Sequence, residues 1–425
     1  MGKNVVIVGG GLAGLAASIY LARAGRTVTL FEKRQYLGGR AITQLRQGFR
    51  FNLGAHAFNR AGSGARVCRE LGIPVPGAVP KPHAIALIDG QERWLPTGVL
   101  SFLGTSLLSL RGKAQLARAI LRIRRIDKHP PGNVTLREWI DANVSDARAR
   151  HVLEALIRLA TYSNDAETAG AALSLAQLKA GLRGVLYVHE GWQRIVDSMR
   201  STAVTSGVNF VSSSRIVGVD IEDGRVRAVR LGGLELDADR TDTRAIAFPE
   251  MTPEAVNGAP LPAEDVILAV DPATASELAG QTWNAQPVTA ACLDVALRTL
   301  PNPKRTFALG IDEPYYFSVH STWAQLAPKG GALVHTVKYG RGSESELEGL
   351  LDRMQPGWRD VIVHKRYMPA MTVSNALVTP AAARPPVTTN VRGLYLAGDW
   401  VGDEGLLSDA SFASARAAAR AILAS

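Results

Sequence analysis

The N-terminal segment carries a glycine-rich turn at residues 9–14, between an apolar strand predicted at 4–8 and a helix predicted over 15–24. A second strand, predicted at 27–31, leads directly into an acidic residue, Glu32. Strand, glycine turn, helix, strand and acid follow one another in the order that a dinucleotide site requires. This segment therefore predicts the start of an α/β domain that binds a dinucleotide.

The spacing of the glycines in this turn has a physical explanation. Gly9 permits a tight turn, Gly11 has no Cβ and lets a pyrophosphate approach the backbone, and Gly14 lets helix and strand pack closely. Leu12 and Ala13 lie where the helix begins, and free N–H groups there, with the positive end of the helix dipole, face the phosphates. Backbone groups of the turn are therefore expected to hold the phosphates.

Glu32 lies where a carboxylate can accept both hydroxyls of an adenosine ribose, which disfavours a 2′-phosphate and hence NADP. Its neighbour Lys33 is a further candidate cofactor contact. Downstream, Gly39 and Arg40 form a glycine turn followed by a cation, a pattern that can also contact a phosphate.

Composition sets wide limits. The chain has 425 residues, 46% hydrophobic and 20% charged, as in a globular protein with two or more cores. Its two cysteines predict no disulfide framework, which fits a reducing cytoplasm, and its eight histidines show no metal-ligand spacing. Residues 4–22 are uncharged and long enough for a membrane span, but the glycine cluster and its spacing argue against one.

A net charge of +10 favours anionic partners, and the excess is concentrated at 111–128. Leu116, Ile120 and Ile123 fall on one helical face there. A basic amphipathic helix of this kind can lie on a membrane surface, or it can bury one face in a domain and leave its arginines in solvent. Nucleic acid is not an expected partner, because no binding motif accompanies the charge.

Along the chain, residues 95–185 are predicted to be mainly helical and 288–375 to be rich in strands. We therefore predict a Rossmann-like α/β domain with a central parallel sheet, discontinuous in sequence, and an inserted α+β substrate domain. The predicted cofactor domain comprises 1–75, 196–275 and 386–425, and the predicted substrate domain comprises 76–195 and 276–385.

Five segments together resemble the flavin oxidoreductases of the amine oxidase, protoporphyrinogen oxidase and phytoene desaturase superfamily. They read VVIVGGGLAGLAA, FEKRQYLGGRA, FNLGAHAF, VILAVDP and LYLAGDW, and a final helix follows them. The resemblance covers essentially the whole chain in order. It implies FAD, because FAD spans such a domain and uses both ends of the chain. The FAD is expected to be non-covalent, because no cysteine lies near the C-terminus.

The resemblance also implies individual contacts. Gly9, Gly11 and Gly14 would hold the pyrophosphate, and Glu32 would hold the adenosine ribose. The other implied contacts are Gly39 and Arg40 with the diphosphate and ribityl region, Gly54, Ala55 and His56 near the flavin, the Ile216 backbone with adenine, Gly398 and Asp399 with the ribityl or phosphate end, and Leu406 and Leu407 with flavin O2. A helix N-terminus at that oxygen would stabilise the negative charge of reduced flavin.

The chain departs from the family pattern at two places. Glu190-Gly191 stands where the family usually has two glycines, and the loop at 404–409 differs from the usual form. The covalent cysteinyl link of some amine oxidases has no candidate, since no cysteine lies near the C-terminus.

Desaturation needs a proton acceptor in addition to the hydride acceptor that flavin supplies. The candidates are His56, His320, His335, Lys338 and Tyr315, with His56 foremost because it follows the expected flavin contact at Gly54-Ala55. Trp400 could line the flavin or substrate cavity, or pack in a core.

The leading hypothesis is an FAD-dependent dehydrogenase or desaturase of a hydrophobic small molecule, with O2 or another acceptor reoxidising the flavin. The alternatives are an amine oxidase that forms imine and hydrogen peroxide, and a flavoprotein without redox turnover. The expected location is cytoplasmic, with a membrane-peripheral contact through 111–128 as an option.

Overall fold

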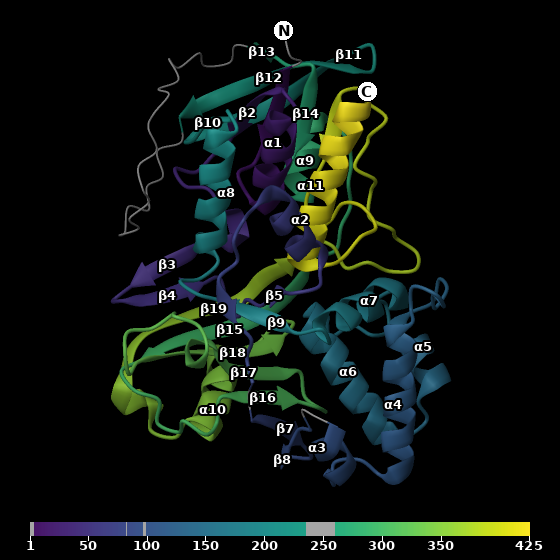
Figure 1. The fold of residues 1–425 in the computed structure, drawn as a ribbon, viewed down its shortest axis with the longest axis vertical. Coiled ribbons are helices and arrows are strands. Elements are labelled where there is room, and N and C mark those ends of the chain that lie inside the picture. Colours follow the sequence, from purple (N-terminus) through teal and green to yellow (C-terminus); the bar gives the residue numbers. More distant parts are fainter. Residues whose placement is uncertain (1–3, 82, 97–98, 235–259) are drawn as a thin grey trace.

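The computed structural model describes residues 4–81, 83–96, 99–234 and 260–425. Two large sheets organise it, one in the upper and one in the lower half of Figure 1. The upper sheet is parallel throughout and has the strand order β10-β2-β1-β14-β20. Its strands are Asn209–Val211, Thr27–Phe31, Asn4–Val8, Asp265–Leu268 and Leu394–Leu396. The predicted α/β architecture with a parallel sheet is therefore confirmed.

The two faces of this sheet are covered differently. Along β1, Val5 and Ile7 pack into one core cluster, whereas Val6 and Val8 pack into another, as expected for alternating side chains of a strand buried on both faces. The first cluster lies among helices α1 (Leu12–Arg23), α2 (Ser63–Leu71), α8 (Gln193–Thr205) and α11 (Leu407–Ala424).

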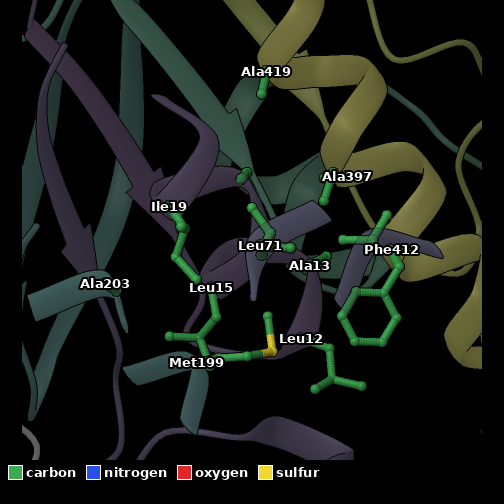
Figure 2. Packing of buried hydrophobic residues seen from close by; sticks show 14 of the residues in the cluster. Leu12, Ala13, Leu15, Ile19, Leu71, Met199, Ala203, Ala397, Phe412 and Ala419 are labelled. Carbon is green, nitrogen blue, oxygen red and sulfur yellow. The ribbon is translucent and has the colours of Figure 1, made fainter. Parts of the chain in front are cut away.

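Figure 2 shows this first cluster, in which Leu15, Ile19, Met199 and Phe412 meet from three of those helices. Burying each such side chain contributes about 1.5–3 kcal/mol. The C-terminal helix is thus part of the same core as the N-terminal turn. The second cluster is covered by α9 (Pro272–Ala279) and by a small sheet of β11 (Ser214–Glu222), β12 (Arg225–Leu234) and β13 (Pro260–Pro262).

The lower sheet has seven strands in the order β19-β15-β18-β17-β16-β7-β8, and only the β16–β7 pair is parallel among its described neighbours. The strands are Ile362–Ser374, Val288–Leu297, Ala332–Tyr339, Tyr315–Val319, Phe307–Gly310, Ala84–Ile88 and Gln91–Trp94. Helix α10 (Glu344–Met354) packs on one face, and a group of helices packs on the other.

That helical group is the predicted helical section. It contains α3 (Val99–Gly104), α4 (Leu110–Arg124), α5 (Leu136–Asn143), α6 (Ala147–Thr161) and α7 (Ala171–Gly181). Helix α5 begins with a capping box in which the Thr135 side chain accepts from the Glu138 N–H and Glu138 accepts from the Thr135 N–H. None of the helices in the described residues is both long and apolar enough to span a bilayer.

Short elements connect the two halves. They are β3 (Thr43–Arg46), β4 (Phe49–Asn52), β5 (Phe58–Asn59), β6 (Gly77–Ala78), β9 (Val185–Val188) and the 3₁₀ turns Gly39–Ala41, His320–Thr322 and Trp358–Val361. The five strands of the upper sheet come from the segments 1–75, 196–275 and 386–425, but the domain boundaries themselves stay a prediction. Residues 235–259 of the second segment lie outside the described residues.

Candidate functional site

The glycine turn excludes side chains at two positions. Gly9 has φ +107°, and a Cβ there would lie 2.5 Å from the carbonyl oxygen of Ala269, the residue that follows the neighbouring strand β14. At Gly14, a Cβ would lie 1.9 Å from the Gly9 carbonyl oxygen. The turn can therefore hold helix α1 against β1 and β14 only with glycine at both positions.

Gly11 is different, because a Cβ there would meet no heavy atom of the described residues within 4 Å. Gly11 is also the N-cap of α1 and has no side chain with which to cap it. The first N–H groups of a helix have no intrahelical acceptor, so those of Leu12, Ala13 and Gly14 are available to a ligand. An open backbone surface with free donors fits a pyrophosphate.

Glu32 is fixed beside this surface. Its Oε2 accepts from the Gly10 N–H at 2.8 Å and its Oε1 accepts from the Arg34 N–H at 3.0 Å. Gly39 lies close to the turn as well, since a Cβ there would be 3.5 Å from the Cα of Gly11. Lys33 is exposed, and its charge helps to lower the pKa of Asp271.

Arg40 and Asp399 join the two ends of the chain by an ion pair of 2.8 Å. Arg40 also donates to the Val373 carbonyl at 3.0 Å. Asp399 is buried, and its two oxygens accept from the backbone N–H and the side-chain amide of Asn375, each at 3.0 Å. The Asp399 carboxylate therefore orients Arg40 and Asn375, and its own contact with a cofactor stays a prediction. Gly398 donates its N–H to the Ser414 hydroxyl of α11 at 2.9 Å.

Arg384 holds the loop between Asp399 and α11, a role that the sequence did not indicate. Its guanidinium donates to the carbonyls of Asp399 at 3.0 Å and Gly405 at 2.9 Å. Burial lowers the pKa of Arg384 to about 10. This arginine fixes the approach to Leu406, the N-cap of α11, and to Leu407, which has φ +56°.

Leu406 and Leu407 line a small cavity between the α11 N-terminus, the ends of β15 and β19, and helices α6 and α7. Its apolar lining residues are Ala169, Leu173, Val288, Ala376, Leu377, Val378, Leu406 and Leu407. Its polar lining comes from the hydroxyls of Thr161, Ser163, Ser174 and Ser374. The lining chemistry suits a mainly apolar molecule.

A buried polar cluster crosses the lower sheet. Asp294 on β15 is opposite His335 on β18 and opposite Arg366 on β19. Its Oδ1 accepts from His335 Nδ1 at 2.6 Å, its Oδ2 pairs with Arg366, and Cys292 donates to it at 3.2 Å. His335 and Arg366 hold the pKa of Asp294 well below its usual range, although burial alone would raise it.

Two imidazole nitrogens beside this cluster have no partner among the described residues, His335 Nε2 and His320 Nδ1. The two rings meet edge to face, with centroids 4.5 Å apart. His320 also stacks on Tyr187 at 3.8 Å, and its Nε2 lies 3.2 Å from the Tyr316 hydroxyl. Burial lowers the pKa of His320 well below its usual value.

His56 lies over this cluster. A Cβ on Gly54 would be 3.5 Å from Cys292 Sγ, so the turn that carries His56 covers the cluster directly. His56 Nδ1 donates to the Gly54 carbonyl at 3.1 Å, and its ring contacts Trp192 edge-on at 5.1 Å. Because burial lowers the pKa of His56 to about 4, the ring is neutral near pH 7, and its Nε2 lone pair has no partner among the described residues.

Cys292, Asp294 and His335 present three ligand atoms within 4.8 Å of one another, a spacing that could hold a metal ion. However, the carboxylate already accepts from His335, Cys292 and Arg366. The Asp294 carboxylate is therefore already satisfied by hydrogen bonds and by the Arg366 charge, and the absence of a metal site stays a prediction.

The remaining predicted residues lie elsewhere. Lys338 lies on β18 three residues after His335, so its side chain points to the face of the sheet that is opposite to His335. There its Nζ pairs with Glu346 of α10 and lies over the Tyr315 ring. Trp400 is fully buried in the second core cluster and donates its indole N–H to the Val270 carbonyl at 2.8 Å. The structure thus brings together His56, His335 and His320, and it leaves Lys338, Tyr315 and Trp400 away from them. Ile216 is buried in the same cluster as Trp400.

Comparison with known proteins gives a family. The model described as flavin containing amine oxidoreductase matches residues 12–423. A carotenoid 3,4-desaturase of Haloarcula japonica is 53% identical over 53 residues, which cover 12% of this chain and 11% of that protein. A 4,4'-diaponeurosporene oxygenase of Staphylococcus aureus is 23% identical over 266 residues, 54% of this chain and 53% of that protein.

The chain thus spans about half the length, or less, of these curated relatives. Among solved structures, wild-type putrescine oxidase bound to putrescine has a TM-score of 0.71 at 15% identity, with 100% of both chains covered. At that identity the likeness shows the fold alone.

Proposed function

This chain belongs to the flavin containing amine oxidoreductase family, and we propose that it binds FAD non-covalently and dehydrogenates a hydrophobic small molecule. Membership implies an oxidoreductase with a flavin cofactor. The choice of FAD, the mode of binding and the class of substrate form the proposal.

The surface around the glycine turn supports FAD. Gly11 is open, the first N–H groups of α1 are free, and Glu32 lies beside them with its carboxylate in place for ribose hydroxyls. Arg40 adds a cation, and the N-terminus of α11 supplies a second set of donors for a flavin oxygen. Non-covalent binding is supported by Cys68 and Cys292, which are both buried and whose pKa values burial raises, so neither is a reactive thiolate.

The apolar cavity at the α11 N-terminus is the observation that carries the choice of substrate. It lies between Leu406 and Leu407 on one side and helices α6 and α7 on the other, and none of its lining side chains is charged. The carotenoid enzymes named above also act, by their names, on apolar molecules, which supports the same substrate class.

When bound, flavin supplies the hydride acceptor. The chain's own residues have to exclude water and receive a proton. His56 is suited to the second task, because its Nδ1–H is held by the Gly54 carbonyl and its Nε2 is free and neutral. We propose that the Asp294–His335 pair positions His56, because the pair lies beneath the Gly54-Ala55-His56 turn. Arg366, which pairs with Asp294, also donates to the Asn52 carbonyl just before this turn.

An anaerobic titration of the FAD-loaded protein tests this function. We expect carotenoids, other isoprenoids or similar apolar donors to bleach the visible flavin absorbance, and polyamines to leave it unchanged. Bleaching by amines, with hydrogen peroxide released in air, would instead establish an amine oxidase, the second activity that this fold accommodates. Binding of FAD without bleaching by any donor class would favour a flavoprotein without redox turnover.

A further inference from the structure

Helix α4 has two apolar faces. Leu116, Ala119 and Ile123 are buried against the neighbouring helices. Leu110 and Leu121, however, are 84% and 55% exposed. They are eleven residues apart, about three helical turns, so they lie within roughly 20° of each other on the side opposite the buried face. Packing within the domain accounts for the first face, whereas no described residue covers the second.

The exposed stripe continues onto neighbouring elements. Leu103 of α3 is 63% exposed and is tied to α4, because Lys113 Nζ donates to the Leu103 carbonyl at 2.6 Å. Trp94, at the end of β8, is 66% exposed. Figure 1 shows β8 and α3 next to each other at the lower end of the molecule, beside the end of α4. Of the nine large apolar side chains exposed in the described residues, these are four.

Arginines lie on both sides of the exposed leucines of α4, and the surrounding stretch of sequence carries no acidic residue. The sequence contains no Asp or Glu between Glu92 and Asp127. At about 100° per residue, Arg118 and Arg125 lie on one side of the Leu110–Leu121 line and Arg124 lies on the other. These three arginines are exposed and have no carboxylate partner among the described residues. The same helix therefore presents apolar side chains and unneutralised positive charge in one direction.

We propose that this α3–α4 surface, defined by Trp94, Leu103, Leu110, Leu121 and the three arginines, docks on an anionic lipid bilayer. Leucine and tryptophan side chains at the crest enter the interface, and the arginines beside them pair with lipid phosphates. A nucleic acid would satisfy the charges but not the apolar crest, and an apolar protein partner would leave the arginines unpaired. The inference does not depend on the proposed function, because it rests on a surface separate from the flavin site.

The docking is tested by sedimentation of the FAD-loaded protein with two kinds of vesicle. One kind is pure phosphatidylcholine, and the other contains equal parts of phosphatidylcholine and phosphatidylglycerol. We expect binding to the anionic vesicles, with weaker binding to the neutral ones and a decrease as salt is added, since salt screens the charge.

Two variants separate the two contributions. Leu110→Ser with Leu121→Ser removes the crest, and Arg118→Gln, Arg124→Gln and Arg125→Gln together remove the charge. Each set should weaken binding to anionic vesicles roughly tenfold or more. The matched controls are Leu45→Ser with Leu423→Ser, and Arg69→Gln, Arg183→Gln and Arg194→Gln, which change exposed residues elsewhere and should leave binding unchanged.

Equal binding of all variants, or no binding to anionic vesicles at low salt, would overturn the proposal. A dimer in solution that dissociates in the leucine variant would also overturn it, because a second copy would then cover the stripe. Thermal unfolding of each variant confirms that it is folded, and flavin bleaching by a water-soluble donor reports on the flavin site independently.

Discussion

His335 Nδ1 donates to Asp294 Oδ1 at 2.6 Å from the directly opposite position on the neighbouring strand. Both side chains are fully buried, and Arg366 reaches the other carboxylate oxygen from the strand on the far side. Three adjacent strands thus contribute one buried, charge-balanced row beneath the turn that carries His56. Such a row fixes the register of the strands, because a shift by one residue would leave these groups unpaired.

Replacing Asp294 with Ala should destabilise the protein by about 3–5 kcal/mol, because Arg366 and His335 would keep their burial and lose their acceptor. Urea unfolding at pH 7 measures the change. The exposed Arg150–Asp141 pair provides the control, and Asp141→Asn should cost less than about 1 kcal/mol. A small loss at Asp294, equal to that at Asp141, would contradict the account of the cluster.

Stability should fall as the pH is lowered from 6.5 toward 4, the interval between the ordinary histidine pKa and that of His56. In this interval the unfolded chain binds protons at its histidines, whereas folded His56 and His320 stay neutral because burial lowers their pKa values. Asp294 acts at lower pH: its pKa is also lowered, so its contribution is complete above the ordinary aspartate pKa and is lost only below it.

Unfolding free energies across this range test the assignment. The His56→Asn and His320→Gln variants should each show a flatter dependence between pH 6.5 and 4 than the parent. Replacing the exposed His129 with Gln should leave the slope unchanged. An unchanged slope in both buried-histidine variants would show that other groups control this transition.

The glycine turn allows folding and cofactor binding to be separated. Gly11→Ala should leave the fold intact, because its Cβ meets no described heavy atom within 4 Å, but it should weaken FAD binding by blocking the phosphate approach. Gly14→Ala should disrupt the turn itself, with its Cβ 1.9 Å from the Gly9 carbonyl oxygen.

FAD titration followed by flavin fluorescence, together with thermal unfolding of the FAD-free protein, distinguishes these effects. Gly349→Ala on the exposed side of α10, where a Cβ also has open space, is the control and should affect neither FAD binding nor folding adversely. FAD affinity unchanged in Gly11→Ala would mean that the phosphates lie elsewhere.

Local patterns predicted individual elements well in both halves of the chain. The strand at 27–31 has the predicted bounds, and Thr135 followed three residues later by Glu138 forms the capping box that this spacing favours. At the departure from the family's two glycines, Glu190 and Gly191 both have positive φ, +63° and +83°, which is the conformation that favours glycine. Glu190 therefore adopts a backbone conformation that favours glycine, and Glu190→Gly should relieve strain there.

The site residues that depend on pairing between distant strands could not be predicted in the same way. Lys338 and His335 lie on one predicted strand, but only the register with β15 and the packing of α10 determine that Lys338 points away from the buried cluster. Likewise, the link between Arg384 and the Asp399 and Gly405 carbonyls results from loop geometry. The alternation of side chains along a strand shows which residues share a face, but it does not show which of the two faces is turned toward the site.

The opposite placement of His56 and Lys338 yields a direct test of the proton acceptor. With a donor that bleaches the flavin, His56→Asn should lower the anaerobic rate of flavin reduction by roughly 10²–10⁴-fold, because Asn keeps a donor for the Gly54 carbonyl but lacks the Nε2 lone pair that would receive the proton. Lys338→Met should leave that rate unchanged, since its Nζ pairs with Glu346 on the other face of the sheet. Stopped-flow absorbance measures both rates, and FAD titration controls for loss of cofactor. A slow Lys338→Met variant beside an unaffected His56→Asn variant would reverse the assignment, and equal rates in both would remove His56 from the reaction.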